Sequence, residues 1–112
     1  MGVVTPFPVS KPGQIVFDRA ELTRILDLYG RMVAAGHWRD YAIYLGQDAA
    51  IFSAFRRASE RPEFKVEKRP ELRNRQGQWA LIGEAGAILR RGAELGPILA
   101  PVERRLMRLV AG

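Results

Sequence analysis

Residues 41–55, YAIYLGQDAAIFSAF, decide the fold of this chain. Two runs rich in aromatic and branched side chains, 41–45 and 50–55, flank the short break Gly46-Gln47-Asp48. Runs of this composition favour strands and the polar break favours a turn, so the stretch predicts a β-hairpin. The sequence on both sides of the hairpin predicts further strands and two helices.

A helix is predicted before the hairpin, over residues 19–35. Asp18 is a good N-cap and Glu21 follows three residues later, which is the spacing of a capping box. Gly36 is a natural stop, because glycine adopts the left-handed conformation that ends many helices. Between these signals the apolar side chains recur at helical spacing: Leu22, Ile25, Leu26, Tyr29, Met32 and Val33.

More strands are predicted after the hairpin. A third strand is expected at 63–68, where Phe64 and Val66 alternate with charged residues. The prolines at 62 and 70 bracket it, which is typical of strand ends or of an edge position. A polar loop over 70–78 precedes a second hairpin, with strands at 79–82 and 87–90 and a turn at 83–86.

The last element is predicted to be helical, because one apolar stripe runs from Leu95 to Val110. Pro97 and Pro101 lack the N–H that a helix interior requires, so we expect a short turn over 93–99 and a restart with Pro101 near the first position. The short apolar run 15–17, before the first helix, predicts a strand or an extended lead-in. The order is then (β)-α-β-β-β-β-β-α. The sequence therefore predicts an α+β fold: an antiparallel sheet of about five strands with two amphipathic helices on one face. Residues 1–13 are expected to form a flexible N-terminal arm, and 14–112 a single domain.

Composition excludes several classes of function. The chain has no cysteine, so disulfides, zinc–thiolate centres and thiol nucleophiles are excluded. No apolar stretch is long enough to span a bilayer and no signal peptide is evident, so we expect a cytoplasmic protein without membrane contact. Catalysis, metal binding and cofactors find no support. The single histidine, His37, follows the first helix and is expected to hydrogen-bond its last carbonyls.

The net charge of +6 resides in the second half of the chain. Residues 1–55 are balanced, whereas 56–112 hold thirteen basic and seven acidic side chains. A local surplus of this kind favours polyanionic partners.

The strongest cluster of basic residues lies in segment 56–75. It predicts a nucleic-acid-binding surface on this segment, with Trp79 or Phe64 stacking on bases. The alternative is a solvated surface whose arginines pair with the interleaved glutamates, and the four glutamates of the segment favour it. The surface requires that the basic residues gather on one side. They are Arg56, Arg57, Arg61, Lys65, Lys68, Arg69, Arg73 and Arg75, joined by Arg90 and Arg91 of the neighbouring hairpin.

Two functions are compatible with these patterns. The leading hypothesis is a small non-catalytic binding module associated with nucleic acid or a ribonucleoprotein. The alternative is a protein–protein adaptor or regulator, and one version of this hypothesis is a homodimer. Such a protein would use exposed aromatics such as Trp38 or Tyr44, or an uncovered sheet face.

Several strings are long enough to be specific to a family. They are FDRAEL (17–22), LYGRMVAAG (28–36), WRDYAI (38–43), FRRASE (55–60), EKRP (67–70) and ILRRG (88–92). Together they resemble a family of small alphaproteobacterial proteins catalogued as a domain of unknown function, and the resemblance covers nearly everything from residue 15 to 110. It implies a bacterial, cytosolic protein of this size, and it implies no activity, ligand or catalytic residue.

Overall fold

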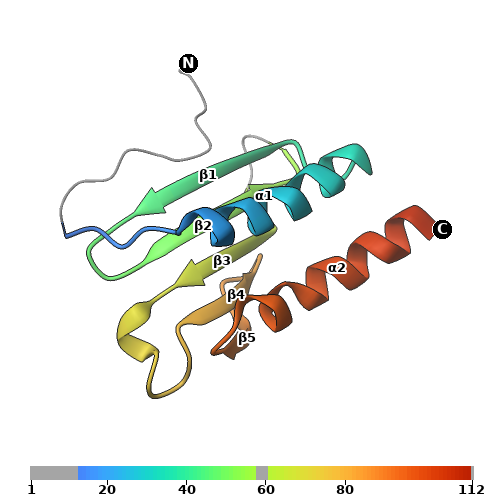
Figure 1. Ribbon diagram of the computed structural model, residues 1–112. Coiled ribbons are helices and arrows are strands. Elements are labelled where there is room, and N and C mark those ends of the chain that lie inside the picture. Colours follow the sequence, from blue (N-terminus) through green and yellow to red (C-terminus); the bar gives the residue numbers. More distant parts are fainter. Residues whose placement is uncertain (1–12, 58–60, 112) are drawn as a thin grey trace.

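The computed structural model describes residues 13–57 and 61–111, so nearly all of the predicted N-terminal arm lies outside the described residues. The predicted α+β class is confirmed: the five strands form one antiparallel sheet in the order β1-β2-β3-β4-β5, and both helices cover the same face of it (Figure 1). The elements are α1 (Arg19–Ala34), β1 (Asp40–Leu45), β2 (Ala50–Phe55), β3 (Phe64–Lys68), the 3-10 turn η1 (Pro70–Leu72), β4 (Trp79–Gly83), β5 (Ile88–Gly92) and α2 (Leu95–Ala111).

The capping box at the start of α1 is confirmed in both directions. The backbone N–H of Glu21 donates to the Asp18 carboxylate at 2.8 Å, and the backbone N–H of Asp18 donates to Glu21 Oε1 at 2.8 Å. The helix ends as predicted, with Gly36 at a φ of +78°. Before the cap, the backbone N–H of Ile15 donates to the carbonyl of Gly46 at 2.7 Å. The segment before α1 is therefore an extended lead-in that is hydrogen-bonded to the turn of the first hairpin.

The two faces of the sheet differ because side chains alternate along each strand. The register places Phe52, Val66 and Leu81 side by side on the face that the helices cover, and all three are buried. On the other face the same strands present Ser53, Lys65 and Ile82, and no described helix covers them.

The edge position considered for residues 63–68 is wrong, because β3 is the central strand and pairs with both β2 and β4. The prolines at 62 and 70 fall just outside its ends, so the ladder loses no N–H donor.

The predicted break in the last helix is also wrong, because α2 is continuous from residue 95 to 111. Pro97 lies in its first turn, where backbone N–H groups have no helical partner in any case. Pro101 cannot donate to the carbonyl of Pro97 four residues before it. Arg90 Nη1 on β5 donates to that carbonyl at 3.1 Å, so a strand side chain replaces the bond that the proline removes.

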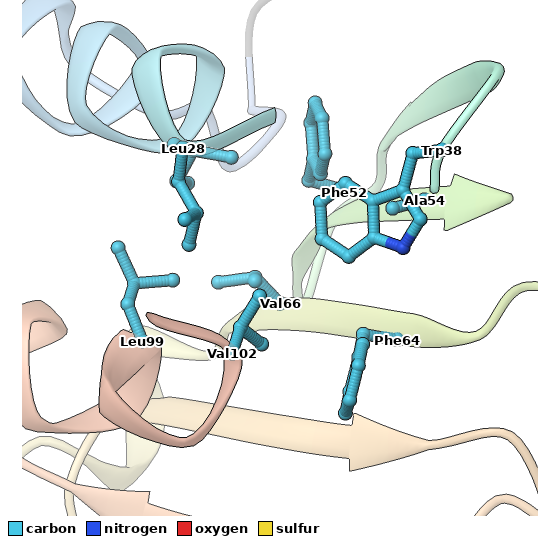
Figure 2. A pocket seen from close by; sticks show the side chains of 9 residues that line it. Leu28, Trp38, Phe52, Ala54, Phe64, Val66, Leu99 and Val102 are labelled. Carbon is cyan, nitrogen blue, oxygen red and sulfur yellow. The ribbon is translucent and has the colours of Figure 1, made fainter. Parts of the chain in front are cut away.

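The core lies between the two helices and the sheet. Figure 2 shows side chains of α1, β2, β3 and α2 converging there, among them Leu28, Phe52, Val66 and Leu99. The space left between them is about 10 Å³ and apolar. A buried water needs several polar partners, which an apolar space of this kind does not supply. The region is therefore a packed core and not a ligand pocket.

Candidate anion-binding site

A single buried carboxylate connects several elements at the end of the sheet where β2 ends and β3 begins. The Glu63 side chain is only 7% exposed. It accepts a hydrogen bond from the indole Nε1 of Trp38 at 2.6 Å, and its two oxygens lie 2.9 and 3.0 Å from Nε2 of His37. Arg105 Nη2, on α2, lies at 3.3 Å and Arg56 Nε at 3.7 Å. Glu63 therefore ties the loop after α1 to the end of β2 and to α2.

The contact with Glu63 determines which nitrogen of the His37 ring carries a proton. An ionised carboxylate only accepts, so Nε2 of His37 carries the proton that faces Glu63. The expected hydrogen bond from His37 to the last carbonyls of α1 is made by its backbone and not by its ring: the N–H donates to the carbonyl of Met32 at 3.0 Å. The ring does not cap the helix and is hydrogen-bonded to Glu63.

An arginine-lined depression opens beside the His37–Glu63 pair. It has a volume of about 580 Å³, its walls are mainly polar, and it is lined by Gly36, His37, Arg39, Arg56 and Arg57. The backbone N–H of Arg39 donates to the carbonyl of Phe55 at 2.8 Å, which holds the loop after α1 against the end of β2. We call these five lining residues the arginine depression.

The arginines of the arginine depression differ in their carboxylate partners. Glu63 and Glu84 both pair with Arg56: Glu84 Oε1 lies 3.0 Å from its Nη2, and Glu63 Oε2 lies 3.7 Å from its Nε. Glu63 also faces Arg105. Among the described residues, no carboxylate lies within 4 Å of the Arg39 guanidinium. Guanidinium groups that line one hollow attract anions, and each can present two parallel N–H groups to a phosphate.

The ten basic residues predicted to bind nucleic acid do not form one surface. Strand register places Ala54 opposite Phe64 at one end of the sheet and Ala50 opposite Lys68 at the other. Basic residues follow or precede the strands at both ends. Arg56, Arg57 and Arg61 lie at the first end, and Arg69, Arg73 and Arg75 at the second.

The remaining basic residues lie on the two faces of the sheet. Lys68 and Arg90 are on the side of the helices: Lys68 Nζ lies 2.6 Å from Glu21 Oε1 and donates to the carbonyl of Val16 at 2.9 Å. Lys65 and Arg91 are on the face that no described helix covers.

A second buried carboxylate, Glu67, organises the uncovered face. Its side chain lies 3.2 Å from Arg69 Nη2 and 3.6 Å from Arg91 Nη2. The hydrogen bond to Glu67 raises the pKa of the Arg69 guanidinium further above its already high ordinary value. Arg91 also donates to the carbonyl of Gly77 at 3.2 Å. These two arginines pair with an interleaved glutamate, as the alternative interpretation expects.

The aromatic residues expected to contact partners are mostly buried. Trp79 stacks on Phe17 at a centroid distance of 6.1 Å, and Phe64 packs on Trp38 at 6.2 Å. Trp79 and Trp38 are 3% and 4% exposed, so neither ring is accessible to a base or a partner, whereas Phe64 is half-buried and its stacking on a base stays a prediction. Tyr44, with 62% of its surface exposed, is the predicted aromatic that remains accessible.

Sequence reasoning missed Arg39, Glu63 and Arg105 as members of one site, because they come from three distant segments. One signal could have suggested the centre of it. His37 and Trp38 are adjacent and both carry ring N–H groups, which need an acceptor once the rings are buried.

The fold and the site together define a small α+β protein with an antiparallel five-stranded meander and an arginine-lined depression at one end. The chain belongs to the DUF2794 family, described as a protein of unknown function, whose sequence model matches residues 15–99. This range contains the arginine depression and Glu63 and ends before Arg105. Comparison with curated proteins and with solved structures finds no match.

Residues 13–57 and 61–111 contain no membrane-spanning helix and no cluster of metal ligands. Neither helix is long and apolar enough to cross a membrane. No group of three or more potential metal ligands comes together in this part of the chain.

Proposed function

We propose that this protein is a small non-catalytic binding module that binds nucleic acid, free or within a ribonucleoprotein, through the arginine depression. The observation that supports it is the convergence of Arg39, Arg56 and Arg57 with His37 around one hollow. A cytoplasmic location, which the absence of cysteine permits, is part of the same proposal.

The buried negative charge of Glu63 would oppose an anion in the neighbouring arginine depression if nothing offset it. The carboxylate faces donors from His37, Trp38 and Arg105, so its own charge is compensated inside the protein. Glu63 also lies 3.7 Å from Nε of Arg56, and this ion pair lowers the entropy that a ligand would lose by ordering the arginine side chain.

The proposal is tested by fluorescence anisotropy with labelled single-stranded RNA and DNA over a series of salt concentrations. If the three arginines neutralise three phosphate charges, log affinity falls against log salt with a slope of about −2. Binding that does not change with salt, or no binding at low salt, would contradict the proposal.

Matched pairs of variants test the location. Arg39→Ala with Arg57→Ala removes two charges from the arginine depression, and should weaken binding about tenfold or more and flatten the salt slope. Arg73→Ala with Arg75→Ala removes the same charge from exposed positions at the other end of the sheet, and should change affinity less than twofold. Equal losses in the two pairs would refute the assignment to the arginine depression.

A second candidate function is a protein–protein adaptor or homodimer that uses the uncovered sheet face. The observation that favours it is the exposure there of Tyr44 on β1 and Ile88 on β5. A pulldown with and without nuclease treatment, combined with light scattering of the purified protein, separates the two candidates. A defined protein partner, or a dimer, that survives nuclease treatment and is lost in Tyr44→Ser would support the adaptor.

A further inference from the structure

We infer that the arginine depression binds the terminal phosphate of a nucleic-acid strand, a phosphomonoester, in preference to the internal phosphodiesters. This inference rests on the proposed function and names the part of the ligand that the site recognises.

The first reason is that the cationic side chains line one hollow of limited extent. Arg39, Arg56 and Arg57 come from two short segments held together by the bond between the Arg39 N–H and the Phe55 carbonyl. A strand bound along its length needs a cation for each successive phosphate it neutralises. Farther along the sheet Arg69 and Arg91 face Glu67 and Lys68 faces Glu21, so these three cations are not available to extend such a track.

The second reason is charge. A phosphomonoester carries about −1.5 to −2 at neutral pH, whereas an internal phosphodiester carries −1. Coulomb attraction grows with the product of the charges, so a concentrated cationic site discriminates in favour of the terminal group. A terminal phosphate also presents three free oxygens, enough for more than one bidentate guanidinium contact.

The third reason is the shape of the site. The hollow, of about 580 Å³, has room for a phosphate and the sugar attached to it, and its walls are mainly polar. His37 forms part of the wall, and its ring is held by the buried Glu63 through Nε2. The ring is therefore already ordered before a ligand enters, which favours a compact polar group over a flexible chain.

The experiment compares RNA and DNA octamers that carry a 5′-phosphate, a 3′-phosphate or hydroxyl groups at both ends. Anisotropy at low salt should show at least about tenfold tighter binding with a phosphate at one of the ends. Arg39→Ala should abolish this gain, and the exposed Arg73→Ala should keep it. Arg39→Lys, which keeps the charge and loses the bidentate fork, should recover only part of it.

Two results would overturn the inference. Equal affinity with and without a terminal phosphate would do so, and the proposed function would still stand if the binding remained salt-dependent and sensitive to Arg39→Ala. A phosphoserine peptide of the same length that binds as tightly as the phosphorylated octamer would refute the assignment to a nucleic-acid end. Inorganic phosphate serves as the competitor, and displacement by it of the phosphorylated octamer alone supports the inference.

Discussion

Replacing Glu63 with glutamine tests whether one buried carboxylate holds the ends of the fold together. The glutamine has the same shape, and its carbonyl oxygen can still accept the indole N–H of Trp38. It has no charge, however, and its amide presents donors to Arg105 and to the protonated Nε2 of His37. The substitution therefore isolates the charge of the side chain from its volume.

The expected loss in the free energy of unfolding is about 2–3 kcal/mol. The bonds from Trp38 and His37 change from charge-assisted to neutral, or are lost, at about 0.5–1 kcal/mol each. Arg105 and Arg56 are 38% and 42% exposed, so water screens their attraction to Glu63 and replaces much of it. Each arginine accordingly contributes only about 0.5 kcal/mol. A domain of this size has a stability of about 5–15 kcal/mol, so the loss is measurable.

Urea denaturation followed by far-ultraviolet circular dichroism and tryptophan fluorescence measures this loss, and Trp38 reports the site directly. Glu71→Gln is the matched control, because Glu71 is exposed and lies 3.9 Å from Arg69. The control should cost less than about 0.5 kcal/mol. If Glu63→Gln costs no more than Glu71→Gln, the carboxylate does not organise this end of the molecule.

Three further predictions concern other parts of the fold. Arg90→Ala should lower the free energy of unfolding by about 1 kcal/mol in the natural sequence. In a chain that already carries Pro101→Ala it should lower it by almost nothing, since alanine restores the missing helical N–H. A double-mutant cycle in urea that shows no coupling between the two positions would contradict this. Burial raises the pKa of Tyr29, so its contribution to stability is present below its ordinary value of 10.0 and is lost as pH rises through the higher folded value; Tyr29→Phe should reduce that alkaline loss in unfolding experiments at about pH 8 and about pH 11. Gly77→Ala should destabilise by at least about 3 kcal/mol, because φ is +98° and a Cβ would overlap the β5 backbone, whereas Gly86→Ala, with φ +91° and open space, should cost only about 1–2 kcal/mol in thermal or urea unfolding.

Elements that depend on neighbours in sequence could be predicted well. The start of α1 follows from Asp18 and Glu21, whose two reciprocal bonds are made within one turn. Both hairpins also follow from local patterns, because strand propensity on each side of a short turn is sufficient to pair adjacent strands.

The last helix shows why local rules can fail. Pro101 predicts a break when only its own helix is considered. The helix continues because Arg90, on the neighbouring strand, supplies a donor to the carbonyl that the proline leaves without one. This compensation depends on how α2 packs against β5, which no local pattern contains.

The candidate site divides in the same way. Arg56 and Arg57 stand out in the sequence as adjacent charges, and they do line the arginine depression. The other basic residues that were grouped with them in the sequence lie elsewhere, because a strand runs across the whole sheet and its two ends are far apart.

The sequence by itself determined the order of helices and strands, the capped start of α1 and the surplus of positive charge in the second half. The tertiary structure alone decided which charges meet. Arg39 lines one hollow with Arg56, and Arg105 meets Glu63, because strand register and helix packing bring their segments to the same end of the sheet. Electrostatic interactions depend on distance and burial in space, and these are set only when the chain has folded.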